Sequence, residues 1–78
     1  METHYLHNFQ DLHSFLLFAR KFRSLTQKQV ADELGVHQTC ISDWEKGKKK
    51  MPTKWLAKIS HLYQLSRREK QTLKSLVK

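Results

Sequence analysis

Three helix-breaking residues divide this chain and limit what it can fold into. Gly35, Gly47 and Pro52 are its only glycines and its only proline. No stretch of the chain alternates apolar and polar residues as a half-buried strand does, whereas apolar residues recur at helical spacing throughout. The pattern therefore predicts an all-α fold of five short helices, in one domain over residues 1–78.

Apolar periodicity and a capping motif indicate the first two helices. We expect the first over residues 8–23, with four residues on its inner face: Phe9, Leu12, Leu16 and Ala19. The second begins at Thr26, because "TQKQ" is a capping box with glutamine three residues after the threonine. It ends at Gly35 after about two turns, which is too short for a stable isolated helix. Neighbouring helices must therefore pack against it.

The third helix, which ends at Gly47, divides into two sides. With Ile41 placed inward and about 100° per residue, the inner side carries His37, Cys40, Ile41, Trp44 and Glu45. The outer side carries Thr39, Ser42, Asp43 and Lys46, and Gln38 lies on the flank. The inward Glu45 needs a cationic partner, because burial of an unpaired charge is costly.

Two further helices are expected after the basic loop "KGKKKMP". The fourth follows Pro52 and has an apolar face of Trp55, Leu56, Ile59, Leu62 and Tyr63. The fifth is expected over residues 66–77, because "SRRE" at Ser66 is a second capping box. Its apolar edge consists of Leu73, Leu76 and Val77.

The charge of the chain favours a polyanionic partner. Lys and Arg total 15 against 7 acidic residues, a formal net charge of +8. This excess places nucleic acid ahead of an anionic membrane surface. No apolar run is long enough to cross a bilayer, and Cys40, the only cysteine, cannot form an internal disulfide. We therefore expect a cytoplasmic protein that does not bind membranes.

A set of short motifs runs from Arg20 to Leu65. They are "LTQ" at the second helix, "ADELGV" through the turn, "IS.WE.G" in the third helix and a proline after the lysine loop. As a set they resemble the Cro/lambda-repressor-like helix-turn-helix family, in which two short helices are joined by a tight glycine turn. The resemblance implies a domain that binds double-stranded DNA in a sequence-specific way. It also implies a homodimer on a palindromic operator, most often as a repressor.

The resemblance assigns the outer side of the third helix to the major groove. Gln38 could pair with adenine, Thr39 could touch a thymine methyl, and Asp43 could accept from cytosine N4. The expected base contacts are His37, Gln38, Thr39, Ser42 and Asp43. The expected phosphate contacts are Thr26, Gln27, Lys28, Lys46, Lys48, Lys49 and Lys50.

Two features of the first helix complete the expected site. In the family an arginine of this helix pairs with the glutamate of "WE.G", so the resemblance implies an ion pair between Arg20 and Glu45. Phenylalanines also form an aromatic edge where the family usually carries charge, and we expect the fifth helix or a dimer partner to cover it. The candidate dimer contacts are Phe15, Phe18, Phe22, Leu73, Leu76 and Val77.

Other kinds of site have less support. The spacing of His4, His7 and His13 matches no zinc signature, so we expect neither a metal nor a cofactor. Cys40 lies on the inner side of a helix with no oriented acid beside it, so we expect no enzyme and no small-molecule substrate.

The leading hypothesis is an autoregulatory repressor of phage or mobile-element type, in the nucleoid of a bacterial or phage-infected cell. Regulators of anti-CRISPR genes and controllers of restriction–modification operons look similar. The alternative is an antitoxin that neutralises a toxin and also represses its own operon. Only residues 1–7 and the last helix could wrap such a partner, which weakens the alternative.

Overall fold

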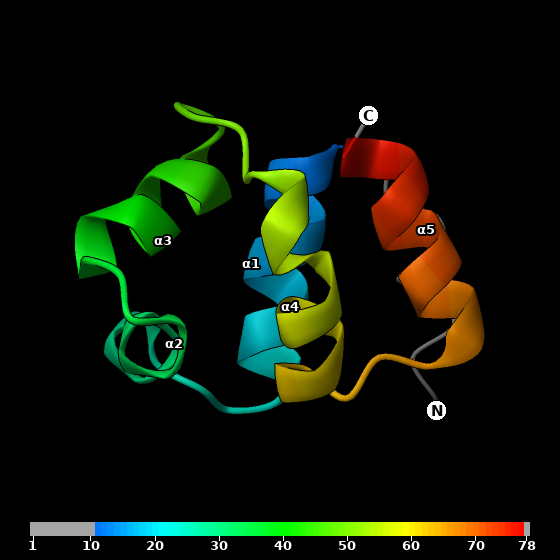
Figure 1. The fold of residues 1–78 in the computed structure, drawn as a ribbon, viewed down its shortest axis with the longest axis horizontal. Coiled ribbons are helices and arrows are strands. Elements are labelled where there is room, and N and C mark those ends of the chain that lie inside the picture. The colour runs from blue at the N-terminus through cyan, green and yellow to red at the C-terminus, as the bar shows by residue number, and fades with distance from the viewer. Residues whose placement is uncertain (1–10, 78) are drawn as a thin grey trace.

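The computed structural model describes residues 11–77, which form five α-helices and one 3-10 turn and contain no strand (Figure 1). In chain order these are α1 Leu12–Phe22, α2 Gln27–Leu34, α3 Gln38–Lys46, η2 Thr53–Trp55, α4 Leu56–Leu62 and α5 Arg67–Val77. The predicted all-α class with five helices is confirmed. None of the helices in this part of the chain is both long enough and apolar enough to span a membrane.

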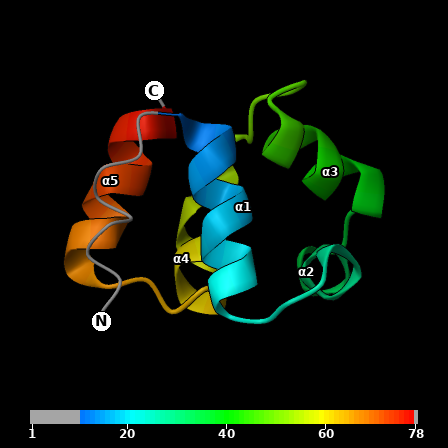
Figure 2. The ribbon, with the colours of Figure 1, turned by 180° about the vertical axis from the view of Figure 1, so that it is seen from behind.

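The helices surround one apolar core. In Figures 1 and 2, α1 and α4 occupy the middle of the longest axis, with α2 and α3 at one end and α5 at the other. α3 packs against α1 and α2, and α5 packs against α1 and α4. The most deeply buried apolar side chains are Phe15, Leu16, Val30, Ile41, Met51, Ile59, Tyr63 and Leu73. Each helix except η2 contributes to this core, so the short helices stabilise one another.

The boundaries differ from the sequence prediction in two places. α1 begins at Leu12, whereas the expected first turn over residues 8–10, with Phe9, lies outside the described residues. The fourth helix opens with the 3-10 turn η2, which Pro52 precedes with extended backbone. A 3-10 turn is wound more tightly than an α-helix, so its side chains point in other directions than a continuous α-helix would give them. Trp55, the last residue of η2, is only partly buried.

Both predicted capping boxes are present. At the start of α2, the Gln29 N–H donates to Thr26 Oγ1 (3.0 Å), and the Thr26 N–H donates to Gln29 Oε1 (2.8 Å). At the start of α5, the Glu69 N–H donates to Ser66 Oγ (3.2 Å), and the Ser66 N–H donates to Glu69 Oε1 (2.8 Å). Each box satisfies backbone donors that a helix N-terminus leaves open, and this fixes where α2 and α5 begin.

Arg23, at the end of α1, joins two turns that are distant in sequence. Its Nε donates to the Tyr63 carbonyl (2.9 Å) and its Nη2 to the Gln64 carbonyl (3.1 Å), both at the end of α4. A cation is favourable there, because the last carbonyls of a helix lack backbone partners. Ser24 and Gln64, one in each turn, have positive φ values of 57° and 53°. The α1–α2 and α4–α5 turns are thus held together by one side chain.

Two glycines end helices in the left-handed conformation. Gly35 ends α2 with φ 72°, and Gly47 ends α3 with φ 76°. Their surroundings differ. A Cβ at Gly35 would meet no atom within 4 Å, whereas one at Gly47 would lie 3.1 Å from His13 Nδ1 on α1. Gly47 is therefore favoured by its backbone conformation, and a side chain there would also require the His13 ring to shift slightly.

We expect Gly47→Ala to destabilise the protein more than Gly35→Ala. Both substitutions place an L-residue in the left-handed region, at a cost of about 1–2 kcal/mol, and only the first also displaces His13. Urea denaturation of the two variants measures the difference in the free energy of unfolding. In a His13→Ala background the cost of Gly47→Ala should fall to that of Gly35→Ala. Equal losses in the two single variants would show that the approach of His13 is not limiting.

Candidate nucleic-acid interface

α3 presents one side to the core and the other to solvent. Ile41, Trp44 and Glu45 are buried against α1 and α2, and Cys40 is partly buried. On the other side Gln38, Thr39 and Lys46 are exposed, while Ser42 and Asp43 are partly exposed. The structure thus separates the residues of α3 as the helical period predicted, with one exception.

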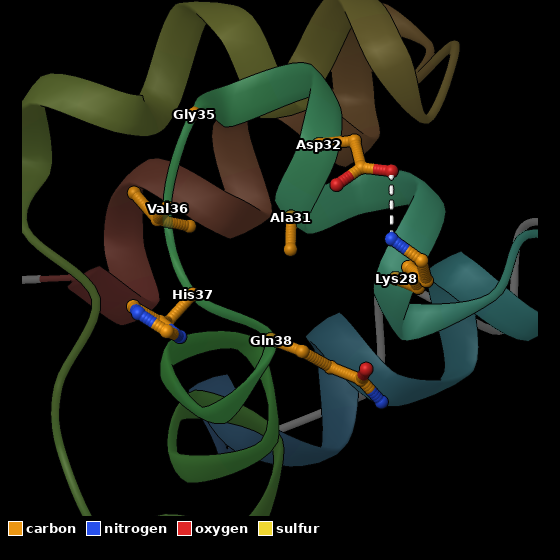
Figure 3. Close-up of a pocket in the computed structure, with 7 residues that line it drawn as sticks. All are labelled: Lys28, Ala31, Asp32, Gly35, Val36, His37 and Gln38. Carbon is orange, nitrogen blue, oxygen red and sulfur yellow. Dashed lines mark hydrogen bonds and ion pairs between the residues drawn. The ribbon is translucent and has the colours of Figure 1, made fainter.

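His37 is that exception. The helical pattern placed it on the inner side, but it is exposed and precedes α3 as the N-cap residue, with φ −70° and ψ 147°. Because its backbone is extended, the angular step of a helix does not apply to it. It forms no side-chain cap. In Figure 3 the side chains of His37 and Gln38 leave the start of α3 in opposite directions.

Arg20 and Glu45 form a buried, two-pronged ion pair between α1 and α3. Arg20 Nε donates to Glu45 Oε2 (2.6 Å), and Arg20 Nη2 donates to Glu45 Oε1 (3.0 Å). Arg20 Nη1 also donates to the Leu25 carbonyl (2.6 Å). Only 8% of Arg20 and 5% of Glu45 are exposed. The inward carboxylate of α3 therefore has the cationic partner that its burial requires.

Two side chains at this site, Arg20 and Tyr63, have raised pKa values. The hydrogen bond to Glu45 raises the pKa of Arg20, an effect that burial partly opposes. Tyr63 is buried nearby, where burial first and the Glu45 carboxylate second raise the pKa of its hydroxyl. The guanidinium thus remains charged, and the phenol remains neutral beside the Glu45 carboxylate.

Gln27 connects the ion pair to the outer side of α3. Its Nε2 donates to Glu45 Oε1 (2.9 Å), and its Oε1 accepts from Gln38 Nε2 (3.4 Å). A continuous chain of hydrogen bonds therefore runs from Arg20 through Glu45 and Gln27 to Gln38. Sequence reasoning placed Gln27 only at a phosphate. Its two bonds join residues 18 and 11 positions apart, and no local pattern signals them.

A hollow of about 520 Å³ lies in the turn between α2 and α3 (Figure 3). Lys28, Asp32, His37 and Gln38 supply its polar groups. Lys28 Nζ lies 3.4 Å from Asp32 Oδ2, and both side chains are largely exposed. A surface pair of this kind contributes little, about 0.3–0.5 kcal/mol, so Lys28 can exchange it for another anion. Thr26, whose hydroxyl caps α2, is also an exposed residue at the start of that helix.

The lysine loop is anchored to the end of α3. The N–H groups of Lys48 and Lys49 donate to the Asp43 carbonyl (2.9 and 3.3 Å), while Lys46, Lys48, Lys49 and Lys50 are all exposed. His13 lines a small hollow beside Gly47 and this loop. Sequence reasoning considered His13 only as a metal ligand, together with His4 and His7, which lie outside the described residues. No metal-binding group of His, Cys, Asp or Glu occurs within residues 11–77.

The candidate dimer contacts fall into two groups. Phe15, Leu73 and Val77 are buried in the core of the single chain, so they leave a dimer partner little surface to contact. Each lies one helical turn from another core residue of its own helix and faces the helix-packed interior. Phe18 and Phe22 are 42% and 43% exposed, and Leu76 is partly buried. Only this second group retains surface that a partner could cover.

Comparison with known proteins agrees with this geometry. A family model described as a helix-turn-helix domain matches residues 14–78. The chain therefore belongs to this helix-turn-helix family, which is of the Cro/lambda-repressor-like type and binds DNA. No curated protein and no solved structure matched the chain.

We expect Arg20→Ala to lower the free energy of unfolding by roughly 3–5 kcal/mol, because it leaves Glu45 buried without a cation. Thermal and urea denaturation measure the loss. Lys21→Ala, at an exposed position on the same helix, is the control and should change stability by less than about 0.5 kcal/mol. An unchanged melting temperature for Arg20→Ala would contradict a stabilising role for the pair.

Proposed function

We propose that this protein is a sequence-specific transcriptional regulator that reads the DNA major groove with α3. The observation that supports this is the division of α3. Its inner side is fixed by Ile41, Trp44 and the Arg20–Glu45 pair, while its outer side is polar and lies beside exposed lysines. The major groove admits one α-helix, and the N-terminal residues of that helix reach the base edges.

The base contacts are proposed at the outer side of α3 and just before it. Gln38 would pair with adenine N6 and N7, Thr39 would touch a thymine methyl, and Asp43 would accept from cytosine N4. Ser42, partly exposed on the same side, and the exposed His37 would complete the set. The bond from Gln38 to Gln27 supports this assignment, because it restricts the amide of Gln38 before DNA arrives.

The phosphate contacts are proposed on both sides of α3. At the start of α2 they are Thr26, Gln27 and Lys28, where backbone N–H groups and the helix dipole favour an anion. Gln27 uses Nε2 toward Glu45, and an amide nitrogen has a second N–H for a phosphate oxygen. Beyond the end of α3 they are Lys46, Lys48, Lys49 and Lys50.

We further propose that the regulator acts as a homodimer on a palindromic operator and represses its own gene. Phe18 and Phe22 lie one turn apart on α1, and their exposure supports an interface on this face. A two-fold dimer would present its two α3 helices about 34–36 Å apart, one turn of B-DNA. This separation corresponds to half-sites about 10–10.5 bp apart.

Selection of bound sequences from a random duplex pool tests both the reading and the symmetry. The selected sites should contain two inverted half-sites at the spacing above. Gln38→Ala should relax the preference at one position of each half-site, at a cost of about 1–3 kcal/mol for the preferred sequence. The sites selected by Phe18→Asp should still contain one half-site, but the second, inverted half-site should be absent. Selected sites without any shared sequence would exclude sequence-specific recognition.

The dependence of DNA affinity on salt tests the phosphate contacts. If about five phosphates are neutralised, a plot of log K against log salt should have a slope of about −4 to −5. Lys48→Ala should make this slope shallower by about 1, whereas Lys58→Ala, on the exposed surface of α4, should leave it unchanged. Fluorescence anisotropy of a labelled duplex measures both. A slope near zero would remove DNA as the partner.

A further inference from the structure

A second surface lies between α4 and α5, away from α3. We call it the α4–α5 groove and define it by six lining residues: Leu56, Ala57, Ser60, Arg67, Lys70 and Lys74. The hollow has a volume of about 520 Å³. A neighbouring hollow shares Leu56 and Lys74 with it, so the groove continues along α5. An elongated occupant therefore fits it better than a compact one.

The charges of the α4–α5 groove have one sign. Arg67, Lys70 and Lys74 lie on one stripe of α5, and no acidic residue lines the groove. From residue 48 to residue 77 the sole carboxylate is Glu69, which is 2% exposed and turned into the interior. Within residues 11–77 no carboxylate pairs with any of the three cations. Among the described residues the groove therefore presents positive charge that no carboxylate compensates.

Part of this row is electrostatically unfavourable within α5 itself, although Lys74 lies in the last turn, where the helix dipole favours a cation. Lys70 and Lys74 are four residues apart, a spacing at which like charges on a helix repel. Arg67 is in the first turn, where the helix dipole disfavours a cation. A solvated helix face usually relieves such repulsion by mixing charge signs. A continuous row of one sign is suited to an anionic occupant, which would relieve this repulsion.

The apolar part of the groove lining and the position of α5 in the fold argue against DNA as the anionic occupant. Leu56 and Ala57 add apolar surface to the cationic wall, and a DNA backbone would leave that surface unused. α5 also lies at the opposite end of the longest axis from α2 and α3, as both ribbon views show (Figures 1 and 2). The duplex read by α3 is therefore a poor occupant, whereas a peptide with both acidic and apolar side chains uses every part of the groove.

A second copy of this chain is also a poor occupant. The exposed carboxylates among residues 11–77 are Asp11, Asp32 and Glu33, and Asp32 already pairs with Lys28. They do not form an acidic stripe that could match the row on α5. We propose that the α4–α5 groove binds an acidic, amphipathic segment of a partner protein. This interaction is separate from DNA reading and does not depend on it.

Peptide binding tests this proposal. The probe is a fluorescein-labelled helical peptide of about the length of α5, with leucines at i, i+3 and i+4 spacing and glutamates at the positions between the leucines. Its anisotropy should rise on titration with the whole chain. Lys70→Glu with Lys74→Glu should weaken binding at least about ten-fold, because like charges then face each other. The matched control, Lys58→Glu with Arg68→Glu, makes the same change in net charge at exposed positions of α4 and α5 outside the groove. It should bind as the unmodified chain does.

A swapped-charge peptide provides a test that does not rest on loss of binding. A peptide with lysine in place of glutamate should bind the Lys70→Glu, Lys74→Glu protein and not the unmodified chain. Equal weakening by the control pair would show non-specific charge attraction and overturn the proposal. So would a larger loss of duplex binding than of peptide binding, which would assign the groove to DNA. A change in sedimentation mass with no change in peptide affinity would assign it to a second copy.

Discussion

The placement of α3 depends on one buried interaction, the ion pair between Arg20 and Glu45. α3 has only nine residues, and such a helix is marginal unless its neighbours hold it. Apolar contacts from Ile41 and Trp44 supply attraction without direction, since the hydrophobic effect is not directional. The two-pronged guanidinium contact adds direction, because its planar fork matches a carboxylate in one geometry. The third guanidinium nitrogen of Arg20, Nη1, donates to the Leu25 carbonyl, so the same side chain also fixes where the chain leaves α1.

The charges are distributed in a way that matches two separate tasks. The two buried acidic residues serve the fold: Glu45 is in the ion pair and Glu69 is in a capping box. Exposed cations occur around the loop after α3 and along α5, whereas Arg20 is buried. A net charge of +8 is therefore not spread evenly. It is concentrated near the helix proposed to read DNA and again at the far end of the molecule.

Much of the fold could be predicted from local sequence signals. The capping boxes at Thr26 and Ser66 and the two helix-ending glycines act through neighbouring residues, and the structure has them where the motifs occur. The periodic pattern also separated the two sides of α3. It failed at His37, because periodicity has no meaning at a residue whose backbone is extended. It also left open whether the fifth helix or a dimer partner covers the aromatic edge of α1, because a local pattern does not show which element will cover a face.

The long-range polar contacts could not be predicted from residue patterns alone. The Arg20–Glu45 pair was inferred only through a family resemblance, since 25 residues separate its partners. Nothing in the sequence indicated that Gln27 would bridge Glu45 and Gln38, or that Arg23 would cap α4. Such contacts depend on the final crossing of helices, which local propensity does not encode. The positions of the helices could thus be predicted from the sequence more readily than the hydrogen bonds and ion pairs between them.

The bridge formed by Gln27 limits how the outer side of α3 can be exchanged for that of another regulator. Gln38 belongs to the outer side, yet its amide ends a chain of bonds that begins at Arg20 in the core. A transplanted α3 with an apolar residue at position 38 would leave the Gln27 oxygen without its donor from α3. Glu45 must also be retained, or Arg20 and Gln27 both lose their acceptor. A graft that preserves the fold would therefore carry residues 27, 38 and 45 together and vary only the positions between them.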